Sequence, residues 1–197
     1  MVVVKGKLIA FEGIDQSGKR TQSNLLHTNI IKMGYNSDLL SFPVYETNIG
    51  SEIRKALRKK NYPVHTIHMM LSANRWEHLD IIKKYLKKND FLVSNRYFHS
   101  NLAYGLARGL DKSWLVNLDK GLPQPDLVIL LDNNPNVSLA RKNKNRDNYE
   151  NIKFLKKVRK IYLDLSKKNN WIVVKADKDR TSLSDEITKK TVKFFNV

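Results

Sequence analysis

The sequence of 197 residues contains no cysteine, only eight glycines and only five prolines. The absence of cysteine excludes disulfide bonds, thiolate nucleophiles and zinc sites that use thiolates, so hydroxyls, carboxylates, imidazoles and cations must supply any chemistry. Long apolar runs are also missing. The segment MVVVKGKLIAFEG has too short an apolar run for a signal peptide or a membrane span, and no later segment approaches the length that a bilayer requires. We therefore expect a soluble, cytoplasmic protein that has no membrane partner.

Linkers, internal repeats and low-complexity segments are absent as well, so we expect a single domain over residues 1–197.

Acidic residues are scarce: the chain has 36 Lys and Arg but only 19 Asp and Glu, which gives a formal net charge of +17. Such a charge attracts polyanions. The lysines nevertheless occur in scattered pairs, and no basic stripe alternates with aromatic residues, so nucleic acid is not expected as a partner.

Short apolar runs alternate with longer stretches of helical periodicity along the whole chain. Five runs are predicted as buried strands: residues 8–12, 38–42, 91–95, 127–132 and 171–175. Helices are predicted near residues 19–33, 48–60, 65–88, 98–108, 112–120, 135–142, 150–169 and 181–195. This alternation is typical of βαβ units, so it predicts an α/β fold with a parallel sheet whose ligands bind beyond the carboxyl ends of the strands.

Residues 13–21, GIDQSGKRT, match the phosphate-binding pattern G-x-x-x-x-G-K-[ST] except at one position. Gly13 and Gly18 permit a tight loop whose backbone N–H groups face an anion, and Lys19 can reach the terminal phosphates. The loop also lies between a predicted strand and a predicted helix, whose positive end favours the anion. The predicted ATP-binding residues are Gly13, Ile14, Asp15, Gln16, Ser17, Gly18, Lys19, Arg20 and Thr21.

Several further segments, together with FEGIDQSGKRTQ at residues 11–22, resemble the thymidylate kinase family. FPVYETNIG (42–50) is similar to the family's FPER-x-x-x-x-G, LSANRWE (71–77) to SANRWE, SNRYFHSNLAY (94–104) to DRY-x-x-S-x-x-AY, GLPQPDLVILLD (121–132) to GLP-x-PDL, and DNYE (147–150) to RYE. The segments follow the family order over nearly the whole chain. The resemblance therefore implies the three-layer P-loop NTPase fold, with a five-stranded parallel sheet flanked by helices.

The resemblance implies an activity: transfer of the ATP γ-phosphoryl group to thymidine 5'-monophosphate (dTMP), giving dTDP and ADP with Mg²⁺, in the synthesis of dTTP. It implies that Lys19 holds the β- and γ-phosphates, that Asp15 receives the deoxyribose 3'-hydroxyl and that Arg96 grips the acceptor phosphate. Arg75 is expected at the thymine edge. The implied substrate-binding residues are Asp15, Phe42, Tyr45, Leu71, Arg75, Arg96, Ser100, Asn101, Tyr104 and Tyr149. Family members commonly form homodimers, and we carry this over as an expectation.

Residues 141–150 are polar apart from Tyr149, which is compatible with a solvated loop or with a mobile lid. The resemblance favours a lid at about residues 139–150. Some family members place a phosphate-loop arginine at the position of Gln16, whereas others deliver the arginine from the lid. The glutamine predicts the second kind, so Arg141 and Arg146 are candidate arginine fingers beside Lys19 and Arg96 as catalytic residues.

Two departures from the family pattern lie where the metal would be. Arg20 replaces the hydroxyl residue that binds Mg²⁺ in ordinary phosphate loops, and Asn95 replaces the aspartate of DRY. Arg20 opposite Asn95 carries the same net formal charge as Mg²⁺ opposite an aspartate, so the arginine can replace part of the electrostatic role of the ion. Alternatively, magnesium delivered with ATP is held by phosphate oxygens and water, with Glu12 and Asn95 as weak ligands through water.

The expected nucleoside pocket departs from the pattern too. Leu71 stands where the family commonly stacks a phenylalanine on thymine, and Tyr45 stands where FPER has its arginine. An apolar wall remains, but the ring-on-ring contact is lost. Two alternatives to a dTMP kinase stay open. Arg20 and Asn95 are compatible with a nucleotide-binding homologue that has reduced or lost catalysis, whereas Leu71 and Tyr45 are compatible with a kinase of relaxed or altered nucleoside monophosphate preference.

Overall fold

A parallel sheet forms the centre of the computed structural model, which describes residues 6–59, 62–140, 152–169 and 171–197. The five strands follow the order β2-β3-β1-β4-β5. They are β1 (Lys7–Glu12), β2 (Ser37–Ser41), β3 (Phe91–Asn95), β4 (Leu127–Asp132) and β5 (Ile172–Lys175). Each strand overlaps a run that the sequence predicted, so the α/β class and the five-stranded parallel sheet are confirmed.

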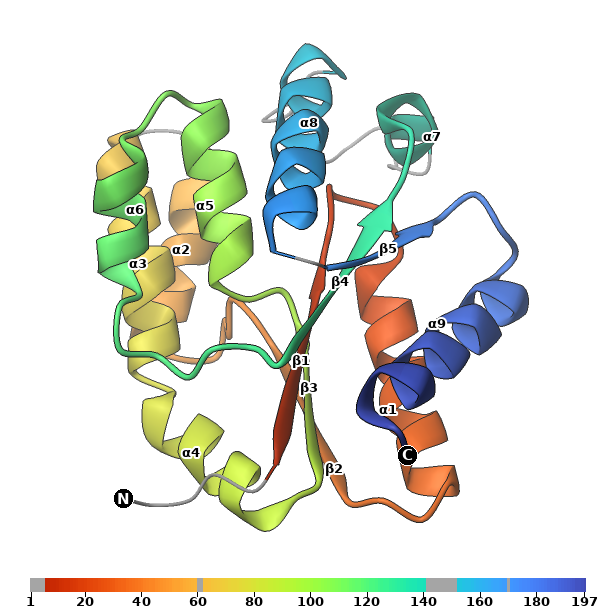
Figure 1. Cartoon of the computed structure of the whole chain (residues 1–197). Coiled ribbons are helices and arrows are strands. Elements are labelled where there is room, and N and C mark those ends of the chain that lie inside the picture. Colours follow the sequence, from red (N-terminus) through yellow and green to blue (C-terminus); the bar gives the residue numbers. More distant parts are fainter. Residues whose placement is uncertain (1–5, 60–61, 141–151, 170) are drawn as a thin grey trace.

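Helices lie on both faces of this sheet, which gives the expected three layers (Figure 1). In the part of the chain that the structure describes they are α1 (Lys19–Lys32), α2 (Asn48–Lys59), α3 (Val64–Trp76), α4 (Leu79–Lys88), α5 (Phe98–Ala107), α6 (Lys112–Leu118), α7 (Pro135–Ala140), α8 (Ile152–Lys168) and α9 (Arg180–Phe195). Helices α1 and α9 cover one face, whereas α4, α5 and α8 lie on the other.

The central strand β1 is buried on both faces, as a strand in a covered parallel sheet must be. Its side chains alternate, so Ile9 and Phe11 pack with α1 and α9, whereas Leu8 and Ala10 pack with α4. Burying one such large apolar side chain contributes about 1.5–3 kcal/mol. The apolar run LIAFE therefore fixes β1 at the centre, and the phosphate loop that follows it starts from a rigid support.

The two edge strands differ from the prediction of uniformly buried strands. The side chains of β2 are only half-buried, and Val173 in β5 is 37% exposed. Both strands lie at the ends of the sheet order and pair on one side only. A short apolar run does not distinguish a central strand from an edge strand, so the prediction of burial was wrong for β2 and β5.

The predicted helix at residues 65–88 is two helices, α3 and α4, and the prediction of one helix was therefore wrong. The imidazole Nδ1 of His78 contacts the Asn74 carbonyl oxygen at 2.7 Å. That oxygen is the acceptor that the backbone N–H of His78 would use in a continuous helix, and this N–H instead donates to the Arg75 carbonyl at 3.2 Å. A side chain that competes for a backbone acceptor ends a helix locally.

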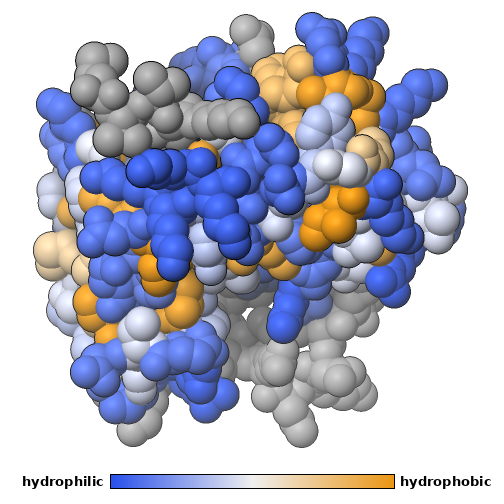
Figure 2. All heavy atoms as spheres, turned by 90° about the horizontal axis from the view of Figure 1, so that it is seen from below, coloured by the Kyte–Doolittle hydropathy of each residue, from blue (hydrophilic) through white to orange (hydrophobic). Residues whose placement is uncertain are grey.

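The carboxyl ends of the strands meet at one edge of the sheet and position the loops of the predicted site. The register places Asn95 beside both Phe11 and Ser41, so the loops after β1, β2 and β3 leave the sheet together. Open parallel sheets bind ligands at this edge. Figure 2 shows the molecule from below, away from this edge of the sheet, and the surface there is mostly hydrophilic with separate hydrophobic groups. Within the described residues, a bilayer-spanning helix is not found.

Candidate active site

The loop between β1 and α1 has a backbone that only small or unusual residues accept. Gly13, Gln16 and Gly18 have φ values of 144°, 60° and 93°. A Cβ atom on Gly13 would lie 2.6 Å from the Leu131 carbonyl oxygen, so the loop passes directly against β4. A loop in which left-handed residues alternate with others turns successive N–H groups inward and creates an anion-binding concavity. The structure therefore has the backbone that the phosphate-binding motif predicts.

Lys19 begins α1 and folds back across this loop. Its ammonium donates to the Ile14 carbonyl oxygen at 2.7 Å and to Ser17 Oγ at 3.4 Å. The first turn of α1 carries no acidic residue, and Gly18 supplies no side-chain cap, so no side chain of that turn neutralises the positive end of the helix. The ammonium, the loop and the helix end together provide the charge that a phosphate chain requires.

Arg96 leaves β3 in a left-handed conformation, with a φ of 67°. This conformation costs a non-glycine residue about 1–2 kcal/mol, and backbone hydrogen bonds with Phe11 and the Ser94 hydroxyl oppose that cost. The guanidinium forms an ion pair with Asp15 and donates to Ser100 Oγ at 2.9 Å. Burial acts to lower the pKa of Arg96, but the opposing electrostatic interactions, the largest of them with Asp15, together raise this pKa well above its ordinary value. Arg96 is therefore a fixed cation beside the phosphate loop.

The two residues predicted as weak metal ligands have different environments. Glu12 is completely buried and accepts four hydrogen bonds, from Tyr97, Ser100 and Tyr162. Asn95 donates to Ser41 Oγ at 2.8 Å, and its own Oδ1 is buried without a hydrogen-bond partner. Among residues 6–59, 62–140, 152–169 and 171–197, no three acidic, histidine or cysteine residues are grouped to hold a metal ion.

Arg75, expected at the thymine edge, is one half of a buried ion pair. Its Nε and Nη2 donate to the two carboxylate oxygens of Asp119 at 2.9 and 2.7 Å, and its side chain is only 3% exposed. Ser72 Oγ donates to the same carboxylate at 2.9 Å. Asp119 thus holds two of the three guanidinium nitrogens, and contact between Arg75 and a base stays a prediction.

Asn101, expected in the nucleoside pocket, connects two helices instead of facing open space. Its Oδ1 lies 2.5 Å from His68 Nδ1, and its amide nitrogen donates to the His68 carbonyl oxygen at 3.2 Å. Both residues are buried. Burial lowers the pKa of His68 to about 4, so the imidazole is neutral at pH 7. The Asn101–His68 pair therefore fixes α5 against α3, and a role of Asn101 toward substrate stays a prediction.

Two of the remaining predicted acceptor residues, Tyr104 and Tyr45, lie near the Arg96 guanidinium. The Tyr104 ring centre lies 5.6 Å from it. Burial raises the pKa of Tyr45, on which the charges of Arg96 and Asp15 also act, so Tyr45 belongs to the same neighbourhood. Phe42 is buried against Tyr97. The half-buried Leu71 lies on α3, one turn before Arg75.

Other predicted residues have less defined surroundings. The side chains of Arg20 and Thr21 are exposed, and the Arg20 guanidinium makes no bond to a described residue. The charge-substitution hypothesis for Arg20 stays a prediction. Arg141, Arg146 and Tyr149, with nearly all of the expected lid, lie outside the described residues.

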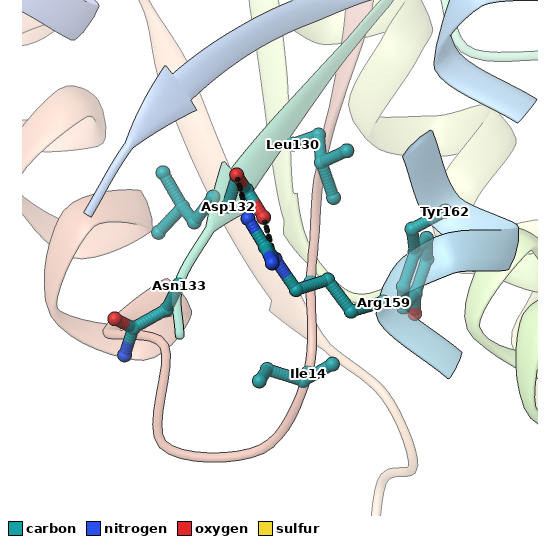
Figure 3. Close-up of a pocket in the computed structure, with 8 residues that line it drawn as sticks. Ile14, Leu130, Asp132, Asn133, Arg159 and Tyr162 are labelled. Atoms are coloured by element: carbon teal, nitrogen blue, oxygen red, sulfur yellow. Dashed lines mark hydrogen bonds and ion pairs between the residues drawn. The ribbon is translucent and has the colours of Figure 1, made fainter. Parts of the chain in front are cut away.

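Sequence reasoning missed four residues that pair with or border this site: Asp119, Asp132, Arg159 and Tyr162. Asp132 ends β4, and its carboxylate receives Arg159 Nε and Nη2 at 2.6 and 2.8 Å. Figure 3 shows this pair beside Ile14 and Tyr162 in a small pocket at the phosphate loop. A polar residue at the end of a buried strand is a usable signal for Asp132. Nothing distinguished Arg159 among the lysines of α8.

The geometry agrees with three comparisons. The family model described as Thymidylate kinase matches residues 11–187. The thymidylate kinase of Plasmodium falciparum is 38% identical over 191 residues, which cover 96% of this chain and 91% of that protein. The human thymidylate kinase is 34% identical over 191 residues, which cover 95% and 90%. The solved structure of thymidylate kinase from Candida albicans aligns with a TM-score of 0.84 and 30% identity, over 98% of this chain and 93% of that one. A chain that shares this loop, this sheet and this sequence belongs to the thymidylate kinase family and is a kinase.

Proposed function

We propose that this kinase transfers the γ-phosphoryl group of ATP to dTMP, giving ADP and dTDP for the synthesis of dTTP. The observation that carries the proposal is the ion pair between Arg96, which follows β3, and Asp15 in the phosphate loop. It joins the residue expected at the acceptor phosphate to the loop expected at the donor phosphates. Family membership, and the acceptor named for the relatives, support the same reaction.

For this phosphoryl transfer the protein must mainly position the two nucleotides and supply positive charge around the transferring phosphate. A phosphate oxygen of dTMP attacks the γ-phosphorus, a new O–P bond forms, and the bond to the bridging oxygen of ADP breaks. The attacking phosphate needs no base, because its second pKa is about 6 and it is largely dianionic at pH 7. Lys19, with the loop N–H groups, holds the donor phosphates, and Arg96 holds the acceptor phosphate in line with them.

The described side chains do not fit a magnesium ion that is bound directly by the protein. Mg²⁺ requires oxygen ligands in octahedral geometry. The oxygens of Glu12 are already engaged by hydrogen bonds, and Arg20 takes the hydroxyl position of the loop. Of the two predicted weak ligands, Asn95 alone has a buried side-chain oxygen without a hydrogen-bond partner among the described groups, its neutral Oδ1. We therefore propose that magnesium enters with ATP and is held by phosphate oxygens and water.

Two further expectations of the family belong to this proposal. Arg141 and Arg146 would act from a lid that closes over the transferring phosphate, with Tyr149 at its end.

A homodimer would form through helices that flank the sheet. Helices α3 and α6 lie side by side, because Ser72 Oγ on α3 donates to the carbonyl oxygen of Leu118 on α6. The apolar side chains of Met69, Trp76 and Val116 on these two helices are 36–49% exposed, and this exposed apolar surface supports the dimer.

A coupled assay of ADP release tests the proposed function with dTMP, dUMP, dCMP, dAMP and dGMP as acceptors, with and without added Mg²⁺. The proposal predicts that dTMP gives the highest kcat/KM. Preference for another base would assign a different acceptor, as Leu71 and Tyr45 allow. Tight ATP binding without turnover of any acceptor would instead indicate a nucleotide-binding homologue. Lys19→Ala provides the control, because loss of the loop ammonium should abolish release of ADP.

A further inference from the structure

The carboxylate of Glu12 is a hub for segments that are far apart in the sequence. Its Oε1 accepts hydrogen bonds from the backbone N–H groups of Tyr97 at 2.9 Å and Ser100 at 3.1 Å. Its Oε2 accepts from Ser100 Oγ at 2.5 Å and from the Tyr162 hydroxyl at 3.0 Å. Because the carboxylate is fully buried with both oxygens satisfied, it is a fixed structural anchor rather than a group that faces a ligand.

This anchor reaches Arg96 through one intermediate side chain. Ser100 Oγ donates to Glu12 and accepts from Arg96 Nη1 at 2.9 Å. The Ser100 hydroxyl is therefore a hydrogen-bond donor to Glu12 and an acceptor from Arg96 at the same time. Its position fixes one edge of the Arg96 guanidinium. The other edge pairs with Asp15. The direction in which Arg96 points thus depends on where Glu12 holds Ser100.

Helix α8 enters the same network through Tyr162. The hydroxyl of Tyr162 lies 3.0 Å from Glu12 Oε2 and 3.1 Å from Ser100 Oγ, and the side chain is 1% exposed. Its ring also meets the Tyr104 ring edge-on at 6.5 Å, and Tyr104 in turn contacts the Arg96 guanidinium. Two chains of contacts therefore run from Tyr162 on α8 to Arg96, one through Glu12 and Ser100 and one through Tyr104.

We infer that Tyr162 is a positioning residue for phosphoryl transfer: through Glu12 and Ser100 it holds Arg96 in line with the phosphate loop. The inference rests on the proposed function for the role of Arg96. One hydroxyl then ties helix α8 to the cation that is proposed to grip the acceptor.

The test is Tyr162→Phe, which keeps the ring and removes only the hydroxyl. Loss of a hydrogen bond to a buried charged network should lower kcat/KM for the acceptor about tenfold, mainly through the KM of the acceptor, and change the KM of ATP less than about twofold. Tyr85→Phe is the matched control. Tyr85 lies on α4 and packs against the core cluster that contains Leu8 and Leu92. Its hydroxyl makes no hydrogen bond within the described residues, so this variant should keep wild-type kinetics within about twofold.

A double-mutant cycle separates positioning from general loosening of the fold. In an Arg96→Lys background, Tyr162→Phe should cost less than about twofold, because the group that it positions is gone. An equal loss in both backgrounds, or wild-type kinetics for Tyr162→Phe, overturns the inference. Should Tyr162→Phe fail to fold, Ser100→Ala breaks the same bridge and must show the same loss of acceptor affinity.

The choice of acceptor keeps this test separate from the proposed function. The variants are compared with whichever monophosphate the wild-type chain phosphorylates fastest, so a preference other than dTMP contradicts the proposed function alone. If the wild type turns over no acceptor, calorimetric titration with dTMP takes the place of kinetics. Equal dTMP affinity of Tyr162→Phe and wild type in that titration overturns the inference.

Discussion

His68 makes the stability of the protein sensitive to mild acid. Burial lowers the pKa of His68 to about 4 in the folded chain, against about 6.5 in an unfolded chain. The unfolded state therefore takes up a proton first as the pH falls. The stabilising contribution is complete above pH 6.5 and is lost progressively toward pH 4. Between pH 7.5 and pH 5.0 this one imidazole should lower the free energy of unfolding by about 2 kcal/mol.

Urea unfolding at the two pH values measures the effect as a difference between wild type and His68→Gln, which removes the titrating group. Wild type should lose about 2 kcal/mol more than the variant on acidification. Ile67→Val is the control: it removes one buried methylene from the same helix, costs about 0.5–1.5 kcal/mol, and should keep the wild-type pH dependence. Equal pH dependence of wild type and His68→Gln would refute the reasoning, because it would mean that His68 is protonated as easily in the fold as outside it.

Three further perturbations address the site itself. Asp119→Ala leaves Arg75 buried without its partner and should lower the free energy of unfolding by about 3–5 kcal/mol in urea; a loss below about 1 kcal/mol would contradict a buried pair. Gly13→Ala places a Cβ 2.6 Å from the Leu131 carbonyl oxygen and should weaken ATP binding at least about tenfold in calorimetry, whereas unchanged affinity would show that the loop tolerates displacement. Asn95→Asp restores an anion beside the loop, so its activity should depend more steeply on free Mg²⁺ than that of wild type; identical Mg²⁺ curves would argue against Arg20 and Asn95 sharing the role of the ion.

Local features of the fold were predictable because their causes lie within a few residues. The apolar run of β1 and the glycines after it gave the strand, the loop and the start of α1. The order of the motifs also placed Asp15 and Arg96 at one edge of the sheet, and they form an ion pair there. The break between α3 and α4 was missed, because it depends on the side chain of His78 taking a backbone acceptor.

The partners of the buried charges were not predictable, since nothing local encodes them. Asp119 is 44 residues from Arg75, and Tyr162 is 150 residues from Glu12. A motif also does not separate a carboxylate that faces a ligand from one that is buried. Glu12 follows the pattern of a site residue, yet its oxygens are turned to the backbone of α5 and to α8. Only the packed structure distinguishes these cases.

A compound that joins adenosine to thymidine through five phosphates tests the central claim most directly. Calorimetric titration should give one site per chain, with affinity at least about a hundredfold above that of dTMP alone, because linking two ligands makes the second binding event intramolecular. Arg96→Lys should remove much of this gain, since the guanidinium lies beside the phosphate loop. Saturation with the compound should also prevent binding of both ATP and dTMP. If dTMP still binds to the saturated protein, the two nucleotides do not share one crevice, and the account is contradicted.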